Sequence, residues 1–410
     1  MRLAWLAVVV VIGLCVGAGT ALSLQQPTRR PVAAAPAPSP QASAAIAASR
    51  STAGKPATPA PRAPGPRVLL AWTPGGLPDG FAARVRDLPH VARVTAVRGD
   101  LVQLRHTRDA SGELVGKAPD EFVVPLDVMA FDRSYPAFVP RSAEDEFRRL
   151  RSHEALLGST SAAVRGVRGG AILHLTGGLV LQVVGVVDDT LIGGAELAVP
   201  AGRGAAPAGA ITSRQRYLLV AYRGQRLALE RRIRHVLPEG LAVRLRGPGE
   251  TPFLRQGDAV LPQSAIKARF GEFAYKSGPG RDVVQDPRWT AEHIASARVP
   301  ILGQVRCHRA LLPALRGALR ELRQRNLASL IDPAGYAGCH SARLTSSRDQ
   351  VSRHAWGVAV DLNYPGNPVG QASTQDPRLV EVMERWGFTW GGRWLVPDPA
   401  HFEYIRPPAP

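Results

Sequence analysis

The spacing of apolar residues divides the chain into four parts. The first is an uncharged apolar run from Leu3 to Leu24. At about 1.5 Å per helical residue it would span roughly 33 Å, enough to cross a bilayer core. Residues 25–67 show no apolar periodicity and consist mainly of Ala, Pro, Ser and Thr. Repeated prolines keep such a segment extended and without a core, so it predicts a linker.

The third part, residues 68–265, contains short β-rich runs that Gly and Pro interrupt. Two of these runs, 171–175 and 179–187, flank a Gly-Gly turn and predict a hairpin. Residues 217–222 predict a further strand. His174 lies inside the first run, where we expect it to pack or to face solvent rather than to bind a ligand.

Helices are predicted between these strands. Ser142 and Asp145 form a capping-box pattern ahead of residues 147–157, which predicts a helix there. Residues 227–237 have helical spacing as well. The region is therefore expected to be an α+β domain, and it contains no cluster of potential metal ligands and no phosphate-binding loop.

The fourth part, residues 266–410, also mixes helices with short strands. Leucines on one face predict a helix over residues 308–327. A second helix is marked by Asp376 as N-cap, Pro377 in the first turn and Gly387 as the stop. We expect α+β structure here too.

The amino-terminal segment, residues 1–24, predicts export. Arg2 and the terminal amine should stay in the cytoplasm and place the rest of the chain outside it. Small residues over 17–23 offer cleavage sites for a signal peptide, but the apolar run is longer than usual for one. We favour a retained membrane anchor, and a secreted protein is the alternative.

The chain is strongly basic, with a formal net charge of +18 and a pI of about 11.0. Only Lys55, Lys117, Lys267 and Lys276 are lysines, so arginine supplies nearly all of the charge. Such a bias reflects either genome composition or attraction to an acidic polymer or membrane surface. No short basic run with interleaved aromatic residues occurs, so nucleic acid is not expected as a partner.

Two Cys-His pairs, Cys307-His308 and Cys339-His340, suggest a zinc site with two cysteines and two histidines. Neighbouring side chains diverge on helices and strands, however, and rarely reach one ion. Outside the cytoplasm an isolated cysteine pair more often forms a disulfide. We therefore predict a Cys307–Cys339 disulfide that fastens the long helix to the segment carrying Arg343 and stabilises the domain by roughly 3–4 kcal/mol.

The last sixty residues carry the candidate chemistry. His354, Asp361 and His401 form a set of two imidazoles and a carboxylate that can hold a catalytic zinc. Asp398 remains as a general base. Gly357 permits the close turn that brings the first two ligands together, since residues seven apart on a straight strand lie on opposite faces.

Several ordered motifs then agree with one family. They are Ser352-x-His354-x-x-Gly357-x-Ala359-x-Asp361, Trp390-Gly391-Gly392-x-Trp394 and Asp398-x-x-His401-Phe402-Glu403, with Gly335-Tyr336-x-Gly338-Cys339 upstream. Over about 140 residues the chain resembles the zinc peptidases that include D-alanyl-D-alanine carboxypeptidases, vancomycin-resistance D,D-peptidases and phage L-alanyl-D-glutamate endolysins. The resemblance implies their hedgehog-like fold for this domain.

The resemblance also implies residue roles. His354, Asp361 and His401 would be the zinc ligands, and Asp398 the general base, as the aspartate is in endolysin-type members. An upstream arginine polarises the scissile carbonyl in the family, and Arg343 fits this role best, with Arg348 as the alternative.

Three residues are expected to contact substrate: Ser352, Trp356 and Tyr336. Trp390 and Trp394 are further candidates for the groove, although tryptophans in a small domain more often belong to the core. Glu403 is expected to support a ligand rather than to act as the base.

Residues 157–189 loosely resemble the extracytoplasmic domains of MacB/FtsX-type permeases. This resemblance implies a module that contacts an envelope protein partner and supplies no catalytic residue.

Together these features predict an exported, membrane-tethered zinc peptidase that cuts amide bonds in peptidoglycan stem peptides. D-Ala carboxypeptidase and L-Ala-D-Glu or cross-link endopeptidase activity both remain open. The alternatives are a non-catalytic zinc module that binds the cell wall or a partner, and an adaptor whose middle domain recruits an envelope complex.

Overall fold

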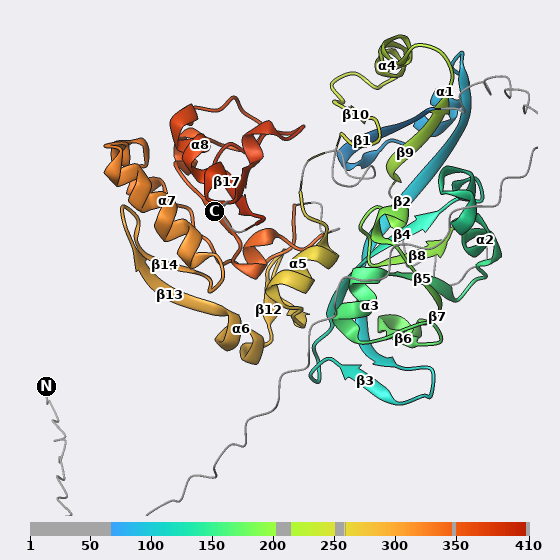
Figure 1. Ribbon diagram of the computed structural model, residues 1–410, viewed down its shortest axis with the longest axis horizontal. Coiled ribbons are helices and arrows are strands. Elements are labelled where there is room, and N and C mark those ends of the chain that lie inside the picture. The colour runs from blue at the N-terminus through green and yellow to red at the C-terminus, as the bar shows by residue number, and fades with distance from the viewer. Residues whose placement is uncertain (1–66, 202–214, 251–257, 259, 347–349, 407–410) are drawn as a thin grey trace, which may run out of the picture. The chain divides into compact units, whose positions relative to one another are not determined.

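The computed structural model describes residues 67–201, 215–250, 258, 260–346 and 350–406 (Figure 1). The predicted membrane segment, the linker up to residue 66 and Arg348 lie outside these described residues. Within them, no helix is both long and apolar enough to span a membrane. Residues 63–410 form one compact unit of mixed helices and strands, as the sequence predicted for the class.

A ten-stranded sheet forms the first part of this unit. Strand β2 (Val91–Arg108) pairs along its length, in turn, with β9 (Gln215–Tyr222), β4 (Val124–Phe131) and β6 (Ile172–Leu175). Strands β4, β8, β5, β7 and β6 also pair in that order, so with β2 they close into a ring. The strands are β1 (Arg67–Leu77), β2 (Val91–Arg108), β3 (Leu114–Lys117), β4 (Val124–Phe131), β5 (Glu154–Gly158), β6 (Ile172–Leu175), β7 (Val180–Val187), β8 (Leu197–Pro200), β9 (Gln215–Tyr222) and β10 (Arg244–Arg246).

The described residues of this part form three buried apolar clusters, two of which lie in the ring and at the β1 end of the sheet. Leu104, Val128, Leu157 and Leu173, from four strands of the ring, pack together in one buried cluster. A second cluster lies between β1, β9 and two helices that cover them. The helices of this part are α1 (Phe81–Arg86), α2 (Arg141–Arg149), α3 (Ser159–Arg165) and α4 (Arg226–His235).

Most of the elements predicted for the middle region are present, and one of the predictions is wrong. Strands β6 and β7 form the predicted antiparallel hairpin, and β9 and α4 match the predictions at 217–222 and 227–237. The helix predicted at 147–157 ends at Arg149 instead, and Glu154–Gly158 is strand β5. Strand β5 pairs with β7 and β8 on its two edges, and its apolar residues are buried on both faces, Ala155 and Leu157 in one cluster and Leu156 in another. A continuous apolar run suits such a strand better than a helix end.

The predicted boundary between residues 265 and 266 falls inside helix α5 (Gln263–Phe270). Gln263 and Lys267 on this helix are hydrogen-bonded to Glu196 of the first part. Ile266 and Phe270 on the same helix belong to the buried core of the second part. The helix therefore contributes to the packing of both regions.

The second part contains the predicted helices and several short strands. Figure 1 shows α7 lying along the hairpin of β13 and β14. Helix α7 begins four residues later than predicted, because Cys307 and His308 belong to β14. The elements are β11 (Tyr275–Ser277), β12 (Val283–Gln285), α6 (Pro287–His293), β13 (Ile294–Val299), β14 (Gly303–His308), α7 (Leu312–Gln324), β15 (Ala359–Asp361), α8 (Pro377–Arg385), β16 (Phe388–Trp390) and β17 (His401–Tyr404).

Candidate metal centre

A three-stranded sheet positions two of the three predicted ligands. Strands β15 and β17 are antiparallel neighbours, and Asp361 lies directly opposite His401 in their register. Residues paired in this way project from the same face of a sheet, so their side chains meet. The pairing explains why residues forty positions apart in the sequence share one site.

The third ligand comes from a 3-10 helix, Arg353–Trp356, just before β15. The Ser352 hydroxyl oxygen caps this helix by accepting a hydrogen bond from the His354 N–H at 3.3 Å. Gly357 ends it in the left-handed conformation, with φ of 65°. A glycine accepts this conformation without strain, and the chain then turns into β15.

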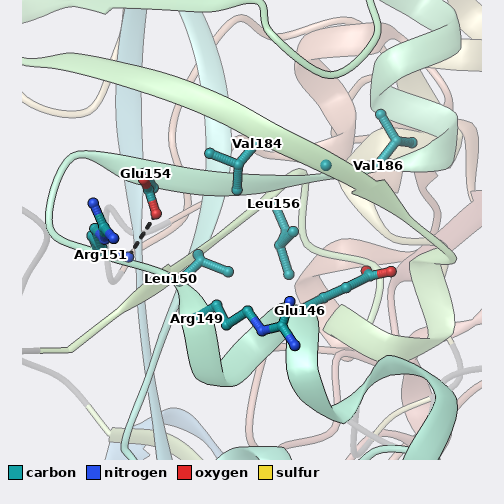
Figure 2. Close-up of a pocket in the computed structure, with 9 residues that line it drawn as sticks. Glu146, Arg149, Leu150, Arg151, Glu154, Leu156, Val184 and Val186 are labelled. Carbon is teal, nitrogen blue, oxygen red and sulfur yellow. Dashed lines mark hydrogen bonds between the residues drawn. The ribbon is translucent and has the colours of Figure 1, made fainter.

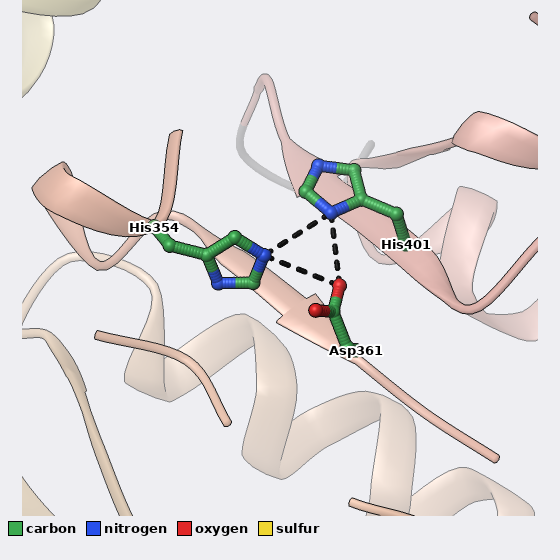
Figure 3. A group of neighbouring side chains, drawn as sticks. All are labelled: His354, Asp361 and His401. Atoms are coloured by element: carbon green, nitrogen blue, oxygen red, sulfur yellow. Dashed lines mark hydrogen bonds and ion pairs between the residues drawn. The ribbon is translucent and has the colours of Figure 1, made fainter. Parts of the chain in front are cut away.

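Figure 3 shows His354, Asp361 and His401 pointing toward one another. The distance from Asp361 Oδ1 is 2.9 Å to His401 Nδ1 and 3.2 Å to His354 Nε2. The two ring nitrogens are 3.2 Å apart. All three residues are buried. Their potential ligand atoms lie within 4.8 Å of one another, and no other His, Cys, Asp or Glu of the described residues joins the group.

The hydrogen bonds on the outer sides of the two rings assign their tautomers. His354 Nδ1 is 2.8 Å from the Cys339 carbonyl oxygen, so it carries the proton that it donates there. His401 Nε2 is 3.3 Å from Glu403 Oε1, which likewise requires a donor. Two nitrogen lone pairs and a carboxylate oxygen therefore converge, and this donor set fits a zinc ion.

The charges of the site point the same way. Burial alone would raise the pKa of Asp361, but the two adjacent imidazoles, when protonated, hold that pKa well below its usual range. Burial alone would lower the pKa of His401, but the carboxylates of Asp361 and Glu403 outweigh it and raise the pKa to about 10, so that without a metal ion the ring binds a second proton at Nδ1. The Asp361 and Glu403 carboxylates are therefore stabilised by a positive charge between them, which either a proton or a metal ion can supply.

Asp398 lies in the turn that leads into β17. Its backbone N–H donates to the Gly391 carbonyl at 3.0 Å, and its own carbonyl accepts from the His401 N–H at 3.1 Å. The side chain is half-buried, and burial raises the pKa of its carboxyl group. No hydrogen-bond donor contacts this carboxylate within the part of the chain that the structure describes. The group is therefore free to exchange a proton.

The other predicted site residues surround the 3-10 helix and β15. Arg343 donates to the Ser341 hydroxyl at 2.8 Å, and its carbonyl accepts from the Ser352 N–H at 3.1 Å. Tyr336 is half-buried, and burial together with the nearby charge of Asp361 raises its pKa to about 12. Both are therefore placed beside segments that carry ligands.

The prediction that Trp356 contacts substrate is wrong. Its side chain is 0% exposed, packs against Phe273 and donates its indole N–H to the Gly271 carbonyl at 3.1 Å. Trp356 is therefore a core residue. Trp394 is the tryptophan that contacts the site, with its ring centroid 5.3 Å from that of His401. Its place in the Trp-Gly-Gly-x-Trp run was the available signal.

The cysteines form a disulfide, with Cα atoms 5.3 Å apart. It joins β14, rather than helix α7 as expected, to the segment whose Cys339 carbonyl orients His354. His340 is engaged with Arg306 and Gln285, and His308 with the Phe270 carbonyl. The alternative zinc site of two cysteines and two histidines is therefore excluded.

A separate hollow of about 500 Å³ lies between α2, β5 and β7. Figure 2 shows Leu150, Leu156 and Val184 lying between the charged side chains of its lining. Glu154 in its rim accepts a hydrogen bond from the Arg151 N–H at 2.8 Å. The hollow shares no residue with the candidate metal centre. It is lined by Glu146, Arg149, Leu150, Arg151, Glu154, Leu156, Val184, Gly185 and Val186.

Comparison with known proteins gives one family match. The sequence model of the D-alanyl-D-alanine carboxypeptidase family matches residues 345–404, which include all three candidate ligands and Asp398. This match confirms the resemblance inferred for the C-terminal region. A search of curated proteins found no match.

Two solved structures are similar to part of the chain. They are the periplasmic region of MacB from Actinobacillus actinomycetemcomitans and the extracellular domain of the noncanonic ABC-type transporter YknZ from Gram-positive bacteria. Both are 12% identical; they cover 41% and 40% of this chain and 81% and 88% of their own, with TM-scores of 0.28 and 0.27. They agree with the resemblance of the middle region, but TM-scores this low support no argument about function.

Proposed function

We propose that the C-terminal region is a zinc-dependent peptidase that hydrolyses amide bonds in peptidoglycan stem peptides. The proposal starts from the match of residues 345–404 to D-alanyl-D-alanine carboxypeptidases. Its main support in the structure is the convergence of lone pairs from His354, Asp361 and His401, each within 3.2 Å of the next. Structural side chains rarely place three acceptors together without a donor or a cation.

His354 Nε2, His401 Nδ1 and Asp361 Oδ1 would hold the ion. When bound, zinc supplies a Lewis acid that activates water near neutral pH. The Cys339 carbonyl and the Glu403 carboxylate keep the two imidazoles in the tautomer that binds metal. With three protein ligands, a bound zinc would keep its fourth position for water or substrate.

Asp398 would act as the general base. Its half-buried carboxylate receives no hydrogen bond from the described residues, so it can take a proton from the attacking water and return it to the departing amine. Burial raises its pKa, which makes it a stronger base than an exposed aspartate. Arg343, or Arg348, would stabilise the negative charge that develops on the scissile carbonyl oxygen. Ser352 and Tyr336 would contact the substrate.

We also propose that the protein acts outside the cytoplasmic membrane, anchored by residues 1–24. The uncharged apolar run after Arg2 supports an anchor. The Cys307–Cys339 disulfide supports an oxidising compartment, because such bonds are rare in the cytosol. The protein's partner would then be an envelope protein that contacts the middle region.

The test is mass spectrometry of purified peptidoglycan after incubation with the full-length, zinc-loaded protein in detergent. We expect defined stem-peptide products, whose masses identify the bond that is cut. The Asp398→Asn variant should bind zinc like the wild type and form no product. Zinc binding without product from the wild type would contradict the enzyme and favour the alternative, a zinc module that binds the cell wall.

A further inference from the structure

The segment between β10 and helix α5 reaches two side chains that contact the candidate ligand His401. These are Trp394 and Glu403. Residues 258 and 260–261 of this segment are described. Asp258 is 7% exposed, and its carboxylate accepts hydrogen bonds from the Arg244 guanidinium and from the Leu395 N–H. Arg244 lies on β10, the edge strand of the ten-stranded sheet, so the contact reaches from that sheet to the loop between β16 and β17.

This loop carries one face of the candidate centre. Arg244 also donates to the Arg393 carbonyl at 3.0 Å, so the residues on both sides of Trp394 are held through their backbones. The Trp394 ring lies against the His401 imidazole, with centroids 5.3 Å apart. Asp258 and Arg244 therefore restrain the ring that packs on His401.

A second series of contacts links Leu261 to His401 through Arg353 and Glu403. The Leu261 carbonyl accepts a hydrogen bond of 2.7 Å from Arg353. The same guanidinium lies 3.9 Å from Glu403 Oε1, and this oxygen faces His401 Nε2 at 3.3 Å. The Arg353 and Glu403 side chains are nearly buried, at 11% and 6% exposed, so solvent screens this pair only weakly.

We infer that Asp258 and Arg353 are positioning residues for His401. Through them, the geometry of His401 and the affinity of the site for zinc depend on how the edge strand β10 and the segment after it pack against the second part of the chain. The inference rests on the proposed function insofar as it concerns zinc. Its physical basis is that partners one shell beyond a metal ligand orient the ring and set its basicity. A partner that moved β10 would then change the site without touching it.

The test compares Asp258→Asn and Arg353→Gln with wild type in the full-length protein. Hydrogen exchange of the metal-free protein, read by mass spectrometry over residues 391–403, should be faster in both variants. The dissociation constant for zinc, measured by competition with a chelator, should rise about tenfold. Urea unfolding of each variant checks that the fold is retained, and Arg353→Lys, which keeps the charge, should recover part of the affinity.

Glu384→Gln is the matched control. It removes the exposed ion pair between Glu384 on α8 and Arg393 in the same loop without touching Asp258 or Leu261. It should leave exchange and affinity unchanged. Wild-type exchange rates in both test variants would overturn the inference whatever the metal result, whereas a wild-type protein that binds no zinc would overturn the proposed function instead.

Discussion

Single residues next to the ligands set the properties of the candidate centre. Each ligand histidine is oriented by one acceptor on its outer nitrogen, the Cys339 carbonyl for His354 and the Glu403 carboxylate for His401. Glu403 Oε2 is buried without a hydrogen-bond partner. Burying a carboxylate oxygen without a hydrogen bond is unfavourable. The favourable contribution of Glu403 must therefore come from its contact with His401.

We therefore predict that Glu403→Gln weakens zinc binding about tenfold, because a neutral amide accepts the His401 proton less strongly. Chelator competition measures the dissociation constant. Glu321→Gln, which changes a carboxylate that pairs with Arg325 and Arg385 in the same domain, is the control and should bind zinc like the wild type. Equal affinity in Glu403→Gln would show that its carboxylate does not support the ligand.

His308 predicts a pH-dependent stability. Its Nε2 donates to the Phe270 carbonyl and its Nδ1 accepts from the Ala310 N–H, both at 3.1 Å, so the neutral ring is fully paired. Burial lowers the pKa of His308 to about 4. The unfolded chain, with a histidine pKa of about 6.5, binds more protons between these values. The free energy of unfolding should therefore be highest above about pH 6.5 and fall by roughly 2–3 kcal/mol toward pH 4.

Urea unfolding at several pH values in the presence of a chelator measures this effect apart from metal binding. His308→Gln keeps a donor for Phe270 and cannot titrate, so its unfolding free energy should fall less steeply with acid. A slope equal to that of the wild type would assign the effect to another group, such as His340, whose pKa burial also lowers to about 4.

At the level of secondary-structure elements, the site depends on how the 3-10 helix passes into β15. Gly357 ends this helix with φ of 65°, and a Cβ atom there would meet the His308 N at 2.7 Å and the Cys307 carbonyl carbon at 3.2 Å. The glycine is thus required both by its conformation and by the close approach of β14. The sequence indicated the first of these requirements and gave no sign of the second.

Gly357→Ala should therefore lower the free energy of unfolding by roughly 2–4 kcal/mol, since backbone strain and a steric clash add together. Gly280→Ala separates the two effects, because Gly280 has φ of 61° and nothing within 4 Å of the added Cβ. It should lose only about 1 kcal/mol. Urea unfolding compares them, and equal losses would mean that the contact with β14 is not tight.

Secondary structure was predictable where local signals were strong. Helix α8 begins as predicted, with the Asp376 carboxylate accepting from the Arg378 N–H at 2.8 Å. The helix predicted at 147–157 was wrong because β5 pairs with β7 and β8 and packs into two apolar clusters, and these partners lie elsewhere in the sequence. A short apolar run does not reveal which neighbours will cover it.

At the level of the chain as a whole, a buried group of charges joins α5 to the large sheet. Lys267 Nζ lies 2.9 Å from Glu196 Oε1 and 2.9 Å from Glu272 Oε1, and Arg165 also contacts both glutamates. Glu196 is 0% exposed. Two cations and two carboxylates balance, so the removal of one member leaves a buried charge without compensation.

Lys267→Met should therefore destabilise the protein by roughly 3–5 kcal/mol. The double variant Lys267→Met with Glu196→Gln should recover most of this loss, because Arg165 and Glu272 remain as a balanced pair. Urea unfolding measures both. If the single variant were as stable as the wild type, the group would not hold α5 against the sheet.

The sequence by itself was sufficient to predict the identity and order of the candidate ligands, the candidate base and the family resemblance. These depend on side-chain chemistry and on short spacings, which the linear order of residues preserves. It did not reveal that Trp356 is buried while Trp394 contacts His401, or that Leu261 and Asp258 reach the supports of His401. The contacts of Leu261 and Asp258 join segments more than ninety residues apart, and the free energy of such pairing has no local signature in the chain.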